Sequence, residues 1–224
     1  MGFECSSNEP NLYTKSQAST YLFLCKYMDD IIYMGFSQEM LIDFKETMMK
    51  KFDMYDLGLL RYFLGLEINQ GKDFIFVCQR KYAENFLHKV TMLDCKTKPS
   101  PMNPNEKLSL DNGSGDANAR KYRKLVGSLL YLTHTRPDLI YDVSIVAHYM
   151  HYPSMHHLGV VKCIMHHHIT STTDFELLYE CTDKLKLERY TDNDWGGLIN
   201  DQKSTSGWVF NLGFASYYMM FKEV

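Results

Sequence analysis

The sequence predicts an α+β fold, and three patterns support this prediction. Short runs of aromatic and β-branched residues are bounded by turn residues, as in antiparallel hairpins. Other stretches repeat apolar residues at helical spacing. After Asp174 apolar and polar residues alternate, which is typical of half-buried strands. The predicted order is therefore hairpin, helix, hairpin and helix, followed by a group of helices and a final group of strands.

The composition is that of a soluble globular protein. The 224 residues are 45% hydrophobic and 23% charged, and a chain of this length can bury a sizeable core as one large or two small domains. The net charge of −3 lacks the basic surplus of a free-standing nucleic-acid binder, but it leaves room for a local basic face. No apolar run approaches the length of a membrane span, no signal peptide is visible, and six cysteines without a C-x-x-C pair favour reduced thiols. We therefore expect a soluble, intracellular protein.

The first predicted hairpin carries two adjacent aspartates, Asp29 and Asp30, at its turn. Apolar runs at 21–25 and 31–34 flank this turn. Neighbouring carboxylates repel each other unless a cation or a general acid–base role offsets the repulsion. Their oxygens suit Mg²⁺, and Mg²⁺ suits phosphoryl transfer by a two-metal route. A solvated acidic turn is the alternative, because turns favour Asp in any protein.

The next stretch predicts a helix and a second hairpin. Residues 38–52 have helical spacing, Ser37 is a suitable N-cap, and the methionine-rich stripe of this helix belongs to the core. Residues 63–69 and 74–78 are predicted strands joined by a turn at 71–73.

The remainder of the chain predicts helices and then strands. A helix over 80–90 leaves Arg80, Lys81 and Lys89 on its outer face. Three prolines and a glycine-rich stretch predict a partly extended, mobile linker over 94–118. Further helices are predicted from about 119, from Pro137 to about Met150, and over 154–169, with strands at 175–179, 185–190 and 206–211.

Several motifs, in order along the chain, carry a resemblance to a known family. The aromatic-Met-Asp-Asp turn resembles motif C of reverse transcriptases. The chain as a whole resembles the Pol polyprotein of copia-type LTR retrotransposons, at about the family's spacing. The segments that carry this resemblance are 52–58, 62–68, 81–84, 122–133, 135–138, 190–195 and 203–207.

The resemblance implies RNA-directed DNA synthesis and roles for particular residues. Asp29 would bind the catalytic Mg²⁺ or Mn²⁺, with Asp30 in support, and Met28 would touch nucleic acid. The hairpin at Phe63, Leu64 and Gly65 resembles the primer grip. The basic face formed by Arg80, Lys81 and Lys89 would hold a primer–template duplex of RNA and DNA, although a solvated face is an equal alternative. Asp192, with Asp194 as runner-up, would be the first metal-binding carboxylate of ribonuclease H.

Both active sites are expected to be incomplete in this sequence. The family places a further palm aspartate upstream of the hairpin, where residues 1–26 offer only Glu4 and Glu9 in no matching context. Further ribonuclease H carboxylates are expected after Val224. We therefore expect no activity of the chain alone, with the remainder of Pol acting in trans, in the nucleus or cytoplasm. A non-catalytic remnant, or a co-opted module that binds nucleic acid or protein, is the alternative.

The same resemblance predicts the domain organisation. Residues 1–92 would be a partial palm with the start of the thumb, and 93–118 a linker. Residues 119–173 would be a helical connection, and 174–224 an incomplete ribonuclease H-like sheet.

Histidines gather in one region, since eight of the nine lie between His134 and His168. Imidazoles suit zinc, copper or nickel. Consecutive residues on a helix point about 100° apart, so the triplet at 166–168 cannot converge on one ion. Only His148 and His151 have good helical spacing, and a metal-binding histidine protein is a distant third hypothesis.

Overall fold

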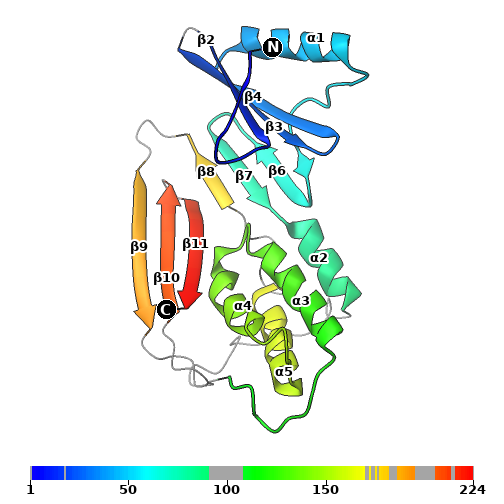
Figure 1. The fold of residues 1–224 in the computed structure, drawn as a ribbon, viewed down its shortest axis with the longest axis vertical. Helices are drawn as coiled ribbons and strands as arrows, with labels where there is room; N and C mark the ends of the chain where they lie inside the picture. The colour runs from blue at the N-terminus through cyan, green and yellow to red at the C-terminus, as the bar shows by residue number, and fades with distance from the viewer. Residues whose placement is uncertain are drawn as a thin grey trace. The chain divides into compact units, whose positions relative to one another are not determined.

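The computed structural model describes residues 2–17, 19–90 and 108–169, and after these residues 172, 175, 177–181, 186–194, 205–212 and 215–223. The chain forms two compact units, Met1–Leu60 and Arg61–Val224, whose elements are labelled in Figure 1. The fold is mixed α and β, with antiparallel sheets in both units, as the sequence predicts.

The first unit is a four-stranded antiparallel sheet with one helix. Its strands follow the order β1-β2-β3-β4, and the helix α1 comes directly after the last strand. The predicted hairpin and the predicted helix are both confirmed. The bounds are β1 (Glu4–Cys5), β2 (Leu12–Gln17), β3 (Thr20–Tyr27), β4 (Asp30–Gly35) and α1 (Gln38–Lys51).

Helix α1 packs its methionine-rich stripe into the core of the first unit. The Ser37 side chain accepts a hydrogen bond from the backbone N–H of Met40, so it satisfies one of the unpaired donors of the first turn. Met40 and Phe44 are buried together with Leu22 of β3. The predicted N-cap and the assignment of the stripe to the core are therefore confirmed.

The second unit begins with a sheet in the order β5-β6-β7-β8. The prediction of one strand over 63–69 is wrong, because Leu64 and Gly65 have φ values of 50° and 85° and turn the chain between β5 and β6. Two successive positive φ values are typical of a type I′ hairpin turn, so the strand cannot continue through them. The bounds are β5 (Tyr62–Phe63), β6 (Leu66–Gln70), β7 (Phe74–Cys78) and β8 (Leu177–Glu180).

Strand β8 reaches this sheet from far along the sequence. It pairs with β7, with Phe74 opposite Glu180 and Val77 opposite Leu177. The remaining three strands form a separate antiparallel sheet in the order β11-β10-β9. The sequence predicts β9 and β10 but not β11, and the bounds are β9 (Leu187–Asp194), β10 (Thr205–Leu212) and β11 (Ala215–Glu223).

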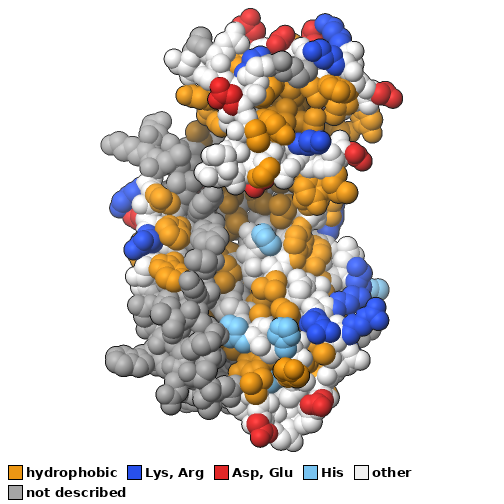
Figure 2. Space-filling model, in the orientation of Figure 1, with side chains coloured by type: hydrophobic (Ala, Val, Ile, Leu, Met, Phe, Trp, Pro, Cys, Tyr) orange, Lys and Arg blue, Asp and Glu red, His pale blue; other side chains and the backbone are white. Residues whose placement is uncertain are grey.

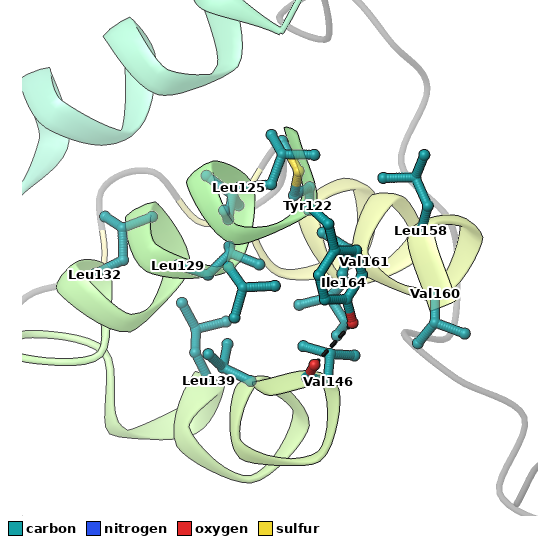
Figure 3. Close-up of a cluster of buried hydrophobic side chains, with 14 of the residues drawn as sticks. Tyr122, Leu125, Leu129, Leu132, Leu139, Val146, Leu158, Val160, Val161 and Ile164 are labelled. Carbon is teal, nitrogen blue, oxygen red and sulfur yellow. Dashed lines mark hydrogen bonds between the residues drawn. The ribbon is translucent and has the colours of Figure 1, made fainter. Parts of the chain in front are cut away.

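The helices of the second unit share one apolar core (Figure 3). Leu129 of α3, Val146 of α4 and Ile164 of α5 are fully buried. The Tyr122 hydroxyl donates a hydrogen bond of 2.7 Å to the carbonyl oxygen of Val146, and burial raises the pKa of that hydroxyl. The bounds are α2 (Arg80–Lys89), α3 (Ala119–Leu132), a 3₁₀ turn η1 (Pro137–Leu139), α4 (Ile140–Ala147), α5 (Met155–Ile164) and a π-helical turn η2 (Met165–Ile169).

The helix that the sequence extends to Met150 ends earlier, at Ala147. The helix predicted over 154–169 changes to π-helical winding at Met165. In both cases the apolar pattern continues beyond the α-helix, because the buried residues Tyr149 and Ile169 still face the core. Periodicity therefore overestimates the length of these helices.

Part of the predicted linker is packed against the helices. The Tyr149 hydroxyl donates to the carbonyl oxygen of Leu108, which is 5% exposed. The Asn112 amide donates to the Ser154 hydroxyl at 2.8 Å. Residues 91–107 lie outside the described part, and the predicted domain limits at 92, 118 and 173 stay predictions.

His157 holds this packed segment in place. Its Nδ1 accepts the backbone N–H of Ser154 at 3.0 Å, and its Nε2 donates to the carbonyl oxygen of Ser109 at 3.0 Å. The ring is fully buried. Burial lowers the pKa of His157, with the hydrogen bond to Ser109 acting in the opposite direction and the charge of His156 lowering it further.

We expect the stability of the second unit to fall on acidification below the ordinary histidine pKa of 6.5. The unfolded chain binds a proton there more readily than the folded one, because folding lowers the pKa of His157, so the contribution is fully present above that pH and is lost as the pH falls. Urea unfolding between about pH 7.5 and 5 measures this, since the sensitive range lies around the histidine pKa. In His157→Gln the corresponding slope should disappear, whereas in His156→Gln it should persist. An unchanged slope in His157→Gln would contradict this assignment.

Candidate nucleic-acid and metal site

The first candidate site is the tip of the hairpin between β3 and β4. Tyr27 and Asp30 are register partners, so Met28 and Asp29 form a two-residue connection. Met28 has a φ of 50° and is 78% exposed. Non-glycine residues are uncommon at positive φ, and such strain gathers at functional sites. An exposed apolar residue in a strained conformation thus stands beside both carboxylates.

Asp29 and Asp30 are both exposed at this tip. In the described part of the chain, no ion pair engages either carboxylate. Their oxygens are the hard ligands that Mg²⁺ prefers, so the donor type fits this ion. Among the described residues, however, no three His, Cys, Asp or Glu side chains come together as a metal cluster. The tip therefore offers part of a coordination shell.

We expect Met28→Gly to raise the free energy of unfolding of the chain by about 1 kcal/mol, because glycine accepts a positive φ without steric cost. Met28→Val should lower it by about as much, since a branched Cβ is strained at this φ. Urea unfolding of the three proteins measures both changes. Equal stability of Met28→Gly and Met28→Val would show that the connection does not hold this conformation.

The second candidate site is the turn between β5 and β6, where the sequence predicts the primer grip at Phe63, Leu64 and Gly65. The Tyr131 hydroxyl of α3 donates to the carbonyl oxygen of Leu64. A Cβ on Gly65 would stand 3.3 Å from that hydroxyl, and the φ of Gly65 is already 85°. The positive φ favours glycine here, and a Cβ would also crowd the Tyr131 hydroxyl. Phe63 is half-buried and Leu64 is 48% exposed, so a rigid turn presents an apolar side chain to solvent.

The basic residues predicted on α2 have different surroundings. The backbone N–H of Lys81 donates to Glu67 of β6 at 2.7 Å, and its ammonium lies 3.9 Å from the same carboxylate and 5.6 Å from the centre of the Tyr62 ring. Lys81 therefore fastens α2 to the sheet. Arg80 and Lys89 are exposed.

Arg80 lines a groove of about 250 Å³ on the sheet. Arg61, which the sequence analysis did not single out, lines the same groove together with Asn69 and Phe76. The sequence pattern gives no signal for this role. The backbone N–H of Ile68 in β6 donates to the carbonyl oxygen of Arg61, and β6 pairs with β7, which precedes Arg80. Cationic and apolar groups therefore line this groove together with the Glu67 carboxylate.

The other predicted metal ligands are Asp192, Asp194 and the histidines. The backbone of Asp192 lies in β9 opposite Gly207 of β10, and its side chain lies outside the described part, as does that of Asp194. His157 is committed to Ser154 and Ser109. No described group of side chains in the histidine-rich region forms a metal cluster. No helix in the described part of the chain is both long enough and apolar enough to cross a bilayer.

Comparison with known proteins agrees with the resemblance seen in the sequence. Residues 1–104 match the family described as reverse transcriptase (RNA-dependent DNA polymerase). The chain is 32% identical over 95% of its length to the retrovirus-related Pol polyprotein from transposon RE1 of Arabidopsis thaliana. It is 30% identical over 92% of its length to that from transposon TNT 1-94 of Nicotiana tabacum. It covers 14% and 16% of these polyproteins.

A shorter relative matches over most of its own length. The uncharacterized mitochondrial protein AtMg00810 of Arabidopsis thaliana is 34% identical over 86% of this chain, which covers 79% of that protein. No solved structure matches the chain.

Proposed function

Because the chain belongs to the reverse transcriptases of copia-type retrotransposon Pol polyproteins, we propose that its first hairpin supplies metal ligands for RNA-directed DNA synthesis. Asp29 would bind Mg²⁺ or Mn²⁺ and Asp30 would support it. The observation that carries the proposal is the hairpin tip, where Met28 has a positive φ and both carboxylates are exposed. Among the described residues, no Lys, Arg or His forms an ion pair with Asp29 or Asp30.

The bound Mg²⁺ would stabilise the charge that develops on the transferred phosphoryl group. Residues of the second unit would contribute contacts to the nucleic acid. The turn at Leu64 and Gly65, which Tyr131 fixes, would support the primer backbone. Arg80 and Lys89 would neutralise phosphates of an RNA/DNA primer–template duplex, while Lys81 keeps α2 on the sheet.

The wider activity of the polyprotein belongs to the same proposal. Asp192 would be the first metal-binding carboxylate of a ribonuclease H site, as its position in a strand of an antiparallel sheet allows. The rest of the polymerase site would come from other parts of Pol, joined in cis or supplied in trans. Its place of action would be the nucleus or the cytoplasm.

A non-catalytic binding module is the second candidate. The match to AtMg00810, of which this chain covers 79%, favours it, because a protein of comparable extent exists apart from a full polyprotein. In such a module the basic side chains would still bind nucleic acid or protein, and the carboxylates at the hairpin tip would have no catalytic role.

We expect the purified chain to bind Mn²⁺ weakly and to extend no primer on an RNA template. A pair of carboxylates without further ligands cannot hold both the attacking and the leaving oxygen. Asp29→Asn should weaken Mn²⁺ binding about tenfold, which corresponds to the loss of one favourable charge interaction. Electron paramagnetic resonance of Mn²⁺ measures the binding, and gel analysis of a labelled primer measures extension.

Asp53→Asn is the matched control, since Asp53 is an exposed aspartate of the same unit that lies outside the β3–β4 hairpin. It should leave Mn²⁺ binding unchanged. Equal effects of the two substitutions would contradict the metal role of Asp29 and favour the binding module. Template-dependent extension that Asp29→Asn abolishes would show that the chain is active alone.

A further inference from the structure

The most concentrated positive charge in the described part of the chain lies at the start of α3. Four cationic side chains fall within its first six residues, and all are exposed. No ion pair found among the described residues includes any of them. These side chains are Arg120, Lys121, Arg123 and Lys124.

This placement opposes the helix dipole. The N-terminus of a helix carries partial positive charge and favours acidic side chains. The first turn of α3 contains no acid, and its cap, Asn118, is neutral. Arg120 and Lys121 therefore lie where the helix dipole disfavours a cation, and an anionic partner would relieve this cost.

The packing of α3 fixes the direction of these cations. Tyr122 and Val126 are fully buried on the opposite face of the helix. Phe86 and Leu87 of α2 belong to the same core, which brings the end of α2 and its exposed Lys89 to the same region. Figure 2 shows Lys and Arg side chains gathered where the last turn of α2 and the first turns of α3 lie in Figure 1.

We propose that Arg120, Lys121 and Lys124 of α3, together with Lys89 of α2, form a binding face for the sugar–phosphate backbone of a nucleic-acid duplex. Arg120 and Lys124 lie one helical turn apart, at about 6 Å of rise, which suits a polyanion with evenly spaced charges. Gly127 follows on the same side, and its Cβ position has no neighbour within 4 Å, so the face stays open.

The apolar side of α3 is buried in the core, which leaves this helix without the exposed apolar face that membrane insertion needs. The chain as a whole carries a net charge of −3, so the face is a local feature.

This proposal rests on the proposed function for the choice of a nucleic-acid duplex as the ligand. It assigns α3, and not α2, as the main surface that binds the duplex. Fluorescence anisotropy with a labelled RNA–DNA duplex tests it over a series of salt concentrations. Arg120→Ala/Lys121→Ala/Lys124→Ala should raise Kd at least tenfold at about 100 mM salt and reduce the slope of log Kd against log salt by about 2 to 3. The midpoint of thermal unfolding should stay equal or rise, because cations leave the helix N-terminus.

Lys72→Ala/Lys162→Ala/Lys186→Ala is the control for the loss of three positive charges, since these lysines are exposed elsewhere in the second unit. It should change the slope by less than the α3 variant. An α3 variant that binds the duplex like the wild type would overturn the proposal, and Arg80→Ala would then show separately whether the nucleic-acid role of α2 stands. Polyglutamate that displaces the duplex as effectively as unlabelled duplex would also overturn it, because the face would then accept any acidic polymer.

Discussion

Leu129→Ala is expected to lower the free energy of unfolding of the second unit by about 3 kcal/mol, because it leaves a cavity in the packed core. Leu129 is fully buried in α3, among residues of α4 and α5 (Figure 3). The core cannot close over the missing side chain without moving three helices. Urea unfolding followed by circular dichroism measures the change.

The neighbouring residue offers a matched control. Leu130 lies in the same helix with the same side chain but is 39% exposed. Leu130→Ala removes the same atoms and should cost less than about 1 kcal/mol, since little of its burial is lost. Similar losses for the two variants would mean that α3 does not bury the face described above.

Arg136→Ala is expected to lower the free energy of unfolding by about 2 to 3 kcal/mol, because it breaks an ion pair whose guanidinium is buried and removes several hydrogen bonds. The Arg136 side chain is 6% exposed and donates to both carboxylate oxygens of Asp138, at 2.9 and 2.7 Å. It also donates to the carbonyl oxygen of Thr172 at 2.8 Å and to its hydroxyl at 2.6 Å. The guanidinium carbon lies 5.0 Å from the centre of the Phe175 ring.

The cost of Arg136→Ala should be near the lower end of this range if Asp138, which is 38% exposed, becomes well hydrated. Arg136→Lys keeps the charge but loses the paired geometry, so it should fall between the wild type and Arg136→Ala. Urea unfolding at low and high salt measures both variants. A stability of Arg136→Ala equal to that of the wild type would show that Arg136 does not join η1 to Thr172 and Phe175 before β8.

Much of the site could be predicted because its signals are local. The apolar runs around Asp29 and Asp30 predict the hairpin, and Ser37 predicts the start of α1, since turn and cap preferences act within a few residues. The strained conformation of Met28 could not be predicted, because sequence patterns do not give the φ of a single turn residue. The turn at Leu64 and Gly65 was missed, since a Leu in the first position of such a turn is unusual.

The sequence by itself determined the family, the order of most helices and strands, and the two carboxylates at the first hairpin. These depend on residue types and on short-range spacing. Only the tertiary structure decided that β8 pairs with β7, that Tyr131 fixes the turn at Leu64, and that Glu67 engages Lys81. The first two contacts join residues at least 67 positions apart, and the third joins residues 14 positions apart, across β7. Such contacts depend on which core the whole unit can bury, because their loop-closure cost is met only when the surrounding side chains pack together.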